Sequence, residues 1–227
     1  MSDSRNSTRA GGVPPATVGR LPLYLRALGD FKAQGKQEVT SEELADAVKV
    51  TSAQLRKDLS YLGGLGTRGS GYKTEDLVAT ISSTLGVNRE WPIVIVGCGN
   101  LGLALASYEG FSKRGFRLAA LFDTAPDIVG IKVPAPDGEQ ITIKDISDLS
   151  SYVRMNNIQI AVITTPASSA QQVCDQLVNA GVYSIMTFAP CTLKVPSGVD
   201  VRQMDLASEL QILTFHEQTK ANEVISI

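Results

Sequence analysis

A glycine pattern in the second half of the chain has the spacing of a phosphate-binding turn. Three glycines follow one another as Gly-x-Gly-x-x-Gly, at Gly97, Gly99 and Gly102. The first would permit a tight turn after a strand, the second would let a pyrophosphate approach the backbone, and the third would let a helix pack closely. The first residues of that helix, Asn100 and Leu101, would offer free N–H groups to the phosphates. The pattern predicts a dinucleotide-binding site, and the alternative is a glycine-rich turn that binds nothing or another nucleotide.

The residues on either side of the glycines favour a βαβ unit. A β-branched run at 92–96 precedes them, a helix is expected over 101–113, and a second apolar run at 118–122 ends at Asp123. A carboxylate in that place accepts hydrogen bonds from the adenosine ribose and repels the 2′-phosphate of NADP. NADH and NAD+ are therefore the expected cofactors.

Strands and helices are expected to alternate up to residue 204, as in a Rossmann-like, doubly wound parallel sheet. We expect strands at 160–164, 184–188 and 199–204, helices at 147–156 and 168–180, and an excursion rich in proline and glycine at 127–143. Residues just after parallel strands lie at the carboxyl edge of the sheet, where ligands bind. The cofactor is therefore expected to contact Thr165, Pro166, Phe188, Ala189 and Pro190 as well.

Groups that would catalyse hydride transfer are missing from the sequence. Nicotinamide enzymes place a proton donor or a metal next to the reacting carbon. The single histidine, His216, falls in the C-terminal segment, no tyrosine has a lysine four residues later, and no spacing of metal ligands is visible. We expect a chain that binds a dinucleotide without turning it over. The alternative is an NAD-dependent oxidoreductase with an appended helical domain.

The composition is that of an ordinary globular protein with room for one large or two small domains. Of the 227 residues, 43% are hydrophobic and 19% are charged. Three separate cysteines, Cys98, Cys174 and Cys191, form no C-x-x-C pair, and no apolar stretch is long enough to span a membrane. We therefore expect a cytoplasmic protein with reduced thiols.

The first ninety residues are expected to form a winged-helix domain. A helical segment covers 14–31, with a new helix beginning at Pro22, and capping boxes at Thr40 and Thr51 open two short helices. Two residues separate the first of these helices from the second cap, which is a helix-turn-helix pattern. Five glycines between 63 and 71 predict a hairpin, or wing, after which Thr74 caps a helix that ends at Gly86.

The helix expected at 52–62 has one face suited to DNA. Three leucines share one side, and the other side is small, polar and cationic. The side chains expected to meet DNA are Ser52, Gln54, Arg56, Lys57, Ser60 and Tyr61, together with Arg68, Gly69 and Gly71 in the wing. Residues 1–90 carry a net charge of +2 and residues 91–227 carry −4, which favours the N-terminal part for such a contact. A solvated helix face and a surface hairpin are the alternative.

The chain is thus divided into a disordered lead-in at 1–13, a winged-helix domain at 14–86, a Rossmann NAD(H)-binding domain at 87–204 and a terminal helix at 205–227. The terminal helix presents an apolar face and follows the last expected strand. It is therefore free to pack on a partner chain.

Several of these segments together resemble the bacterial redox-sensing transcriptional repressor family Rex, from about Pro14 to the terminal helix. The resemblance rests on Arg-Leu-Pro-Leu-Tyr (20–24), Gln-Leu-Arg-Lys-Asp (54–58), Gly-Thr-Arg-Gly-Ser-Gly-Tyr (66–72), Gly-Cys-Gly-Asn-Leu-Gly (97–102), Tyr-Glu-Gly-Phe (108–111), Phe-Asp (122–123), Phe-Ala-Pro (188–190) and Asp-Leu-Ala-Ser-Glu-Leu (205–210).

The resemblance implies a homodimer that binds a palindromic operator when NADH is scarce and leaves it when NADH binds. It implies that NAD+ competes with NADH and that the terminal helix, with Phe215, swaps onto the partner subunit near its nicotinamide pocket. It also implies that Arg20, Tyr108 and Asp205 couple the nicotinamide pocket to the DNA-binding domain. A nucleotide-gated module that binds a protein partner instead of DNA is a further alternative.

The chain departs from the family in two places. The family usually continues its ribose acid as Asp-x-Asp-Pro-x-Lys, whereas this chain has Asp-Thr-Ala-Pro-Asp at 123–127. The family often has Asn before Phe-Ala-Pro, whereas this chain has Thr187. These departures concern the contacts beyond Asp123 and the loop on the nicotinamide side.

Overall fold

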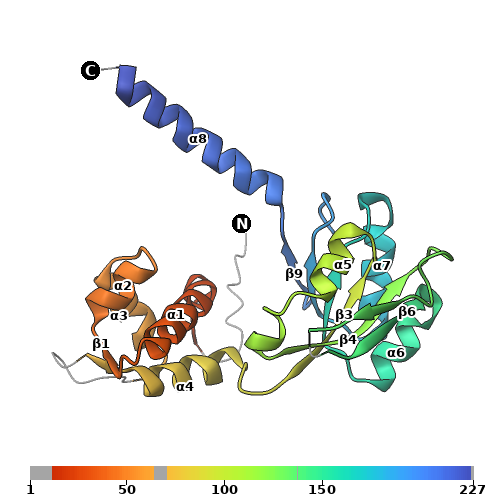
Figure 1. The fold of residues 1–227 in the computed structure, drawn as a ribbon, viewed down its shortest axis with the longest axis horizontal. Coiled ribbons are helices and arrows are strands. Elements are labelled where there is room, and N and C mark those ends of the chain that lie inside the picture. The colour runs from red at the N-terminus through yellow and green to blue at the C-terminus, as the bar shows by residue number, and fades with distance from the viewer. Residues whose placement is uncertain (1–11, 64–70, 137, 226–227) are drawn as a thin grey trace, which may run out of the picture. The chain divides into compact units, whose positions relative to one another are not determined.

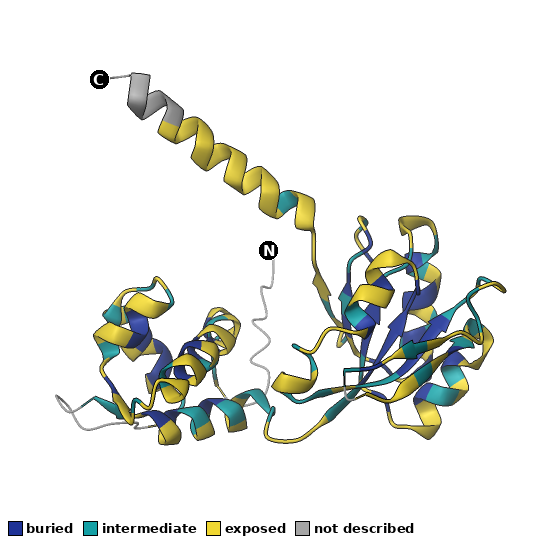
Figure 2. Ribbon diagram, in the orientation of Figure 1, coloured by how far each residue is buried: buried dark blue, intermediate teal, exposed yellow. Residues whose placement is uncertain are grey.

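The computed structural model describes residues 12–63, 71–136 and 138–225. The chain divides into two compact units, Met1–Arg89 and Glu90–Ile227, each with its own buried core (Figures 1 and 2). None of the described helices is long and apolar enough to cross a membrane.

The N-terminal unit is a small helical bundle with a two-stranded sheet. Its elements are α1 (Pro15–Ala33), β1 (Glu38–Val39), α2 (Ser41–Ala47), α3 (Ser52–Ser60), β2 (Tyr72–Lys73) and α4 (Thr74–Leu85). Strands β1 and β2 pair antiparallel, so the strand after the glycine-rich segment pairs with the residues before α2. Leucines from all four helices and Tyr24 of α1 fill the core. The helix-turn-helix of α2 and α3 therefore rests on α1 and α4.

The expectation that a new helix begins at Pro22 was wrong, because α1 continues through this residue. Leu21, Tyr24 and Leu28, on either side of the proline, are completely buried. A proline inside a helix costs about 3 kcal/mol. Burying each such side chain returns about 1.5–3 kcal/mol, so packing of this face outweighs the lost hydrogen bond.

Two of the three expected helix caps also differ. The capping box at Thr40 is complete, with Glu43 N donating to Thr40 Oγ1 and Thr40 N donating to Glu43 Oε2. Thr51 accepts from the Gln54 backbone, but the Gln54 side chain does not reach back to complete the box. Thr74 is the first residue of α4 rather than its cap, and its buried hydroxyl donates to the Lys36 carbonyl at 2.8 Å. This bond ties the start of α4 to the segment before β1.

The second unit is built on a seven-stranded sheet in the order β5-β6-β4-β3-β7-β8-β9, parallel except for β5. The strands are β3 (Trp91–Val96), β4 (Phe116–Asp123), β5 (Lys132–Pro134), β6 (Gln140–Asp145), β7 (Ile160–Ile163), β8 (Ser184–Thr187) and β9 (Asp200–Gln203). The six parallel strands have the spatial order 3-2-1-4-5-6, which is that of the dinucleotide-binding fold. The expected Rossmann-like sheet is confirmed.

Helices cover both faces of this sheet (Figure 1). They are α5 (Asn100–Ala106), α6 (Leu149–Met155) and α7 (Ala167–Ala180), and α8 (Leu206–Ile225) follows the last strand. On β3, Val94 and Val96 pack in the cluster with α6 and α7, whereas Ile93 and Ile95 pack in the cluster that includes α5. Successive side chains of a strand point to opposite faces, so β3 is buried on both sides.

Two expectations for this unit were wrong. The excursion at 127–143 contains β5 and most of β6, and β6 pairs parallel with β4. The helix expected over 101–113 ends at Ala106, and a short 3-10 turn at Ser112–Arg114 follows. The Tyr108 ring lies where a side chain on residue 110 would be, and it packs edge-on against Phe111 with 5.3 Å between ring centroids. These aromatic contacts lie in the segment between the end of α5 at Ala106 and the 3-10 turn that begins at Ser112.

Helix α8 is exposed throughout its described side chains except Ser208 (Figure 2). Five large apolar side chains on it are between 52% and 65% exposed: Leu206, Leu210, Ile212, Leu213 and Phe215. The three leucines share one face, while Ile212 and Phe215 lie on other sides. A helix that is apolar on several sides is normally buried, yet the described residues of the second unit leave these side chains of α8 uncovered.

Candidate functional sites

The glycine turn connects β3 to α5, and contacts within the protein explain two of its glycines. Gly97 has φ +101°, in the left-handed region, and a Cβ built there would lie 2.8 Å from the Thr165 backbone nitrogen. A Cβ on Gly102 would overlap the carbonyl oxygen of Gly97. The fold alone therefore requires glycine at these two positions.

Gly99, the N-cap of α5, has no such internal reason to be glycine. Its φ is −69°, which any residue can adopt, and a Cβ there would meet no other atom within 4 Å. Its missing side chain leaves free space beside the start of α5. This is the space in which a pyrophosphate could approach the backbone.

Asp123, the last residue of β4, points its carboxylate into the glycine turn. Oδ2 accepts a hydrogen bond from Cys98 N, and Oδ1 accepts from Thr124 N at 2.7 Å and Ala125 N at 2.9 Å. Three backbone donors thus fix the orientation of this acid beside Gly97 and Gly99. Ala125, one of these donors, stands where the family has its second Asp, and because it donates through its backbone N–H this bond does not depend on the side chain at that position.

Cys98, inside the turn, is a packing residue. Its side chain is completely buried, and its thiol donates to the Phe122 carbonyl at 3.5 Å. Burial, together with the nearby charge of Asp123, raises the pKa of the Cys98 thiol to about 12. A thiol that stays protonated is a poor nucleophile, which is the opposite of a redox-reactive cysteine.

The loop after β7 lies against the glycine turn. Thr164 Oγ1 donates to the Gly97 carbonyl at 2.6 Å, and the backbone of Thr165 comes close enough to exclude a side chain at Gly97. Strands β3 and β7 are parallel neighbours. They form the topological switch point of the sheet, because the strands that follow β3 are added on one side and those that follow β7 on the other. Thr165 Oγ1 is buried and has no hydrogen-bond partner in the described part of the chain. An unpaired buried hydroxyl at this edge fits a ligand that supplies the missing partner.

The loop after β8 is shaped by the buried Thr187. Thr187 Oγ1 accepts from Ala189 N at 3.1 Å, which bends the backbone between them. Ser and Thr hydroxyls form the same kind of turn as an Asn side chain, so Thr187 can replace the family asparagine in this role. Phe188 N donates to the Ile163 carbonyl at 2.9 Å, Ala189 is buried, and Pro190 is exposed. The expected loop residues therefore lie next to the end of β7.

Helix α3 has an outward face with the expected polar residues. Lys57 is exposed and forms no ion pair with another described residue, and Ser60 Oγ donates to the Lys57 carbonyl. Arg56 points to α2, where Nη1 lies 3.2 Å from Ser41 Oγ and 3.3 Å from Glu42 Oε1. Ser52 is half-buried and Tyr61 is 39% exposed. Lys57 is thus the outward cation of this face, and Arg56 is partly engaged within the protein.

The expected wing is only partly described. Arg68 and Gly69 lie outside the described residues. Gly71 has φ +76°, and a Cβ there would lie 2.8 Å from the Val39 carbonyl oxygen. Close approach of β1 therefore requires glycine at this position.

The prediction of the DNA-facing residues missed a buried charge, Asp58 of α3. Both of its carboxylate oxygens accept hydrogen bonds from side chains of Thr17, Arg20, Tyr24 and Gln54. Burial opposes its ionisation, but these hydrogen bonds outweigh it and hold the pKa of Asp58 well below its usual range. The available signal was an acid between Leu55 and Leu59 on the core-facing side of the helix.

The three residues that the resemblance assigns to coupling lie in different units. Arg20 belongs to the N-terminal unit and pairs with Asp58. In the second unit, Tyr108 Oη accepts a 3.4 Å hydrogen bond from Arg114, and Asp205 caps the start of α8 through Ala207 N and Ser208 N. Each residue is thus held locally within its own unit.

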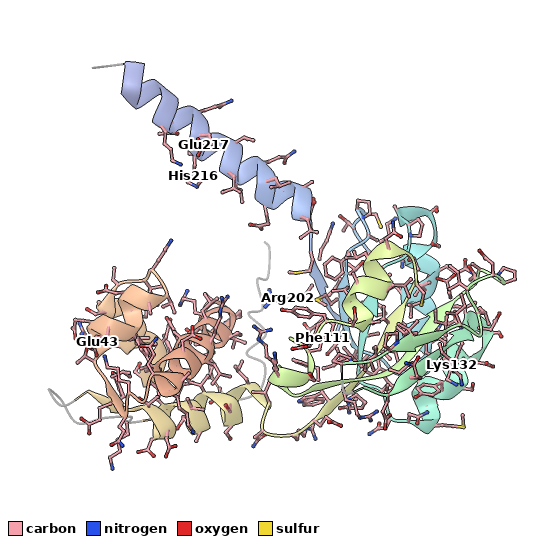
Figure 3. The ribbon with its side chains drawn as sticks, in the orientation of Figure 1. Glu43, Phe111, Lys132, Arg202, His216 and Glu217 are labelled. Atoms are coloured by element: carbon pink, nitrogen blue, oxygen red, sulfur yellow. The ribbon has the colours of Figure 1, made fainter. Side chains whose placement is uncertain are left out.

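Two further features concern catalysis. His216 lies on α8 and is exposed (Figure 3). Among the described residues, no group of three or more His, Cys, Asp or Glu side chains could hold a metal ion.

Comparison with known families agrees with the two units. The family model described as putative DNA-binding protein N-terminus matches residues 12–60, and the one described as CoA binding domain matches residues 88–191. A redox-sensing transcriptional repressor Rex from Streptomyces griseus is 56% identical over 96% of this chain and 85% of the relative. Another Rex, from a Roseiflexus species, is 44% identical over 89% of this chain and 90% of the relative.

The chain belongs to the Rex family of redox-sensing transcriptional repressors.

Solved structures of a Rex-family repressor share the fold of this chain. RSP, a Rex-family repressor, superimposes with a TM-score of 0.83 at 32% identity, covering 92% of this chain and 95% of RSP. RSP in complex with β-NADH superimposes with a TM-score of 0.84 at 31% identity, covering 95% of this chain and 99% of that one. The expected Rex family and the expectation of a repressor rather than an enzyme are confirmed by these relatives.

Proposed function

We propose that this chain acts as a homodimeric repressor that binds a palindromic operator and releases it when NADH binds. The observation that carries the proposal is a glycine turn open at Gly99 in the same chain as a helix-turn-helix with an outward cation at Lys57. Structures of RSP with β-NADH, and with β-NAD+ and operator DNA, support it. A repressor acts where the chromosome lies, so we propose the cytoplasm as its compartment.

The dinucleotide would lie across the carboxyl edge of the sheet, at the switch between β3 and β7. We assign the pyrophosphate to the glycine turn and the adenosine ribose to Asp123. The nicotinamide end would lie toward the loops after β7 and β8. The full set of assigned residues is Gly97, Gly99, Asn100, Leu101, Gly102, Asp123, Thr165, Pro166, Phe188, Ala189 and Pro190.

The DNA would be bound by the N-terminal unit, within the domain that we place at 14–86. The start of α3 would enter the major groove, and the wing would reach the minor groove. The assigned residues are Ser52, Gln54, Arg56, Lys57, Ser60, Tyr61, Arg68, Gly69 and Gly71. Phosphate contacts would supply most of the affinity and make it dependent on salt.

The dimer would form through α8, which we place in a segment, 205–227, that swaps onto the partner subunit. The support is the set of exposed apolar side chains on several sides of this helix, Phe215 among them. Covering them in a dimer would remove a large apolar surface from water. Two-fold symmetry would then match the palindrome, with half-sites about 34–36 Å apart or a multiple of that distance.

Release of DNA would follow from linkage between the two sites. A ligand shifts a two-state dimer only by its difference in affinity for the two states. NADH and NAD+ differ by a hydride and a ring charge, so the discriminating contacts must surround the nicotinamide. We assign Arg20, Tyr108 and Asp205 to the transmission of this difference to the DNA-binding units.

A gel-shift titration with both cofactors tests the proposal. The probe is the duplex that the chain itself enriches from a random-sequence library. NADH is expected to displace the protein at a far lower concentration than NAD+. An equal response to both cofactors, or no duplex enriched, would contradict the proposal. Removal of residues 206–227 is expected to give a monomer with weakened DNA binding.

A further inference from the structure

Gln54 lies at the edge of the outward face of α3, next to the buried Asp58. It is the third residue of the helix, and its side chain is half-buried. Recognition helices meet base edges mainly through residues near their N-termini. Gln54 is therefore placed where a side chain can reach a base, while its amide nitrogen is bound to a carboxylate inside the protein.

The inner end of Gln54 is bound to Asp58. Nε2 donates to Asp58 Oδ1 at 2.9 Å, across one helical turn. The same carboxylate receives Thr17 Oγ1 at 2.9 Å, Tyr24 Oη at 2.6 Å, and Arg20 through Nε at 2.6 Å and Nη2 at 2.7 Å. Five hydrogen bonds saturate the roughly four lone-pair sites of a carboxylate, so its position is fixed by α1.

This network decides which end of the Gln54 amide faces outward. An ionised carboxylate only accepts hydrogen bonds, so the amide nitrogen must face Asp58 and the amide oxygen must face away. No described residue donates a hydrogen bond to Gln54 Oε1. The helix thus presents an oriented acceptor at its outer edge, rather than an amide free to turn.

We propose that Asp58 is a positioning residue that holds Gln54 so that Oε1 reads an amino group on a base edge in the major groove. The amino groups available there are N6 of adenine and N4 of cytosine. This inference rests on the proposed function, and it adds a specificity determinant to the DNA-binding site. In this proposal, Asp58 itself does not contact the DNA.

The test combines base analogues with variants. In each half-site of the selected duplex, adenine is replaced in turn by purine and cytosine by pyrimidin-2-one, which removes one amino group at a time. Wild-type protein is expected to lose about 5–10-fold in affinity at one position per half-site, the value of one hydrogen bond. In Gln54→Ala, the loss at that position is expected to shrink to less than about twofold, as in a double-mutant cycle.

The role of Asp58 is tested with a matched pair of variants. Asp58→Asn removes the charge that orients the amide. It is expected to abolish the fall in affinity that the base analogue causes at this position, as Gln54→Ala is expected to do. Thr17→Val removes another hydrogen bond to the same oxygen without touching Gln54, and it is expected to keep the loss. A general loosening of α3 would affect both variants alike.

A second measurement covers the case in which Asp58→Asn does not fold. In wild-type protein, the side-chain amide signals of Gln54, assigned by their disappearance in Gln54→Ala, are expected to lie away from random-coil positions and to exchange slowly. Random-coil amide signals would overturn the inference, as would an amino-group loss that Gln54→Ala leaves unchanged or that Thr17→Val also removes. Enrichment of no duplex would overturn the proposed function and this inference with it.

Discussion

Arg20 of α1 and Asp58 of α3 form a bidentate ion pair, with Nε 2.6 Å from Oδ2 and Nη2 2.7 Å from Oδ1. The Asp58 side chain is completely buried, whereas the Arg20 side chain is 26% exposed. The DNA-facing helix is therefore held against α1 by a buried charge as well as by the leucines of the core. Because two charges and three neutral donors meet in one place, the orientation of α3 depends on all of them.

Replacement of Arg20 by alanine tests this dependence. It would leave Asp58 buried without its cation, and we expect the free energy of unfolding to fall by about 2–3 kcal/mol, less than for a fully buried pair because Arg20 is partly exposed. Tyr24→Phe removes one hydrogen bond from the same carboxylate and is expected to cost about 1 kcal/mol. Denaturant unfolding, together with hydrogen exchange of α1 and α3, would measure both. Equal losses in the two variants would contradict the dominant role of the ion pair.

The same network predicts how stability depends on pH. The pKa of Asp58 in the folded protein lies well below its usual range, because hydrogen bonds to the carboxylate outweigh its burial. The unfolded chain, with an Asp pKa of about 4, binds the proton more readily. The stabilisation is therefore present above about pH 4 and is lost as the pH falls toward the folded pKa. Thermal melts at several pH values should show a melting temperature that falls toward acid pH in the wild type and falls less steeply in Asp58→Asn. The same fall in both proteins would contradict the role of Asp58 in this pH dependence.

Short-range patterns predicted most of the elements that position the sites. The glycine spacing and the apolar runs located β3, α5 and β4, because strand and helix periods are local properties of the sequence. The motif also predicted that Gly99 is the glycine at which a pyrophosphate would approach the backbone. It assigned a turn role to Gly97 and a packing role to Gly102 as well. It could not name the contacting atoms, which belong to Thr165 and to the turn itself.

Contacts between distant residues explain what the sequence did not reveal. Asp58 receives hydrogen bonds from residues 34–41 positions earlier, and no local pattern shows such a meeting. Pro22 carried a true helix-breaking signal that tertiary packing of α1 overrode. Strand β6 was missed although Ile141 and Ile143 alternate with polar residues, because the glycines and prolines before it suggested a loop.

A pair of glycine variants separates binding from folding in the turn. Gly99→Ala places a methyl group in open space at an ordinary φ, and we expect the free energy of unfolding to change by less than about 1 kcal/mol. The same methyl group should hinder a pyrophosphate and weaken NADH binding at least tenfold. Gly102→Ala, which collides with the Gly97 carbonyl, should instead lower stability. Calorimetric titration and thermal melts would measure the two effects, and intact NADH affinity in Gly99→Ala would refute the assignment.

Asp123→Asn tests the ribose assignment. Asparagine keeps one acceptor oxygen of the two that hold the turn, and it removes the charge that would repel a 2′-phosphate. We expect NADH affinity to fall about tenfold and the preference for NADH over NADPH to narrow. Asp127→Asn, at an exposed acid four residues later, is the matched control and should change neither. An unchanged ratio of the two affinities in Asp123→Asn would place the ribose elsewhere.

Lys57→Ala tests the outward face of α3. Lys57 is exposed and lacks an ion pair with any described residue, so its charge is available to a DNA phosphate. We expect weaker operator binding, a slope of log affinity against log salt that is smaller by about one, and unchanged NADH affinity. Lys32→Ala removes the same charge from α1, where Lys32 pairs with Glu75 at 3.0 Å, and it should leave the slope close to that of the wild type. A direct contact between Lys57 and a phosphate releases counterions, whereas a lysine away from the DNA does not. Equal salt slopes in Lys57→Ala and Lys32→Ala would therefore contradict a direct phosphate contact of Lys57.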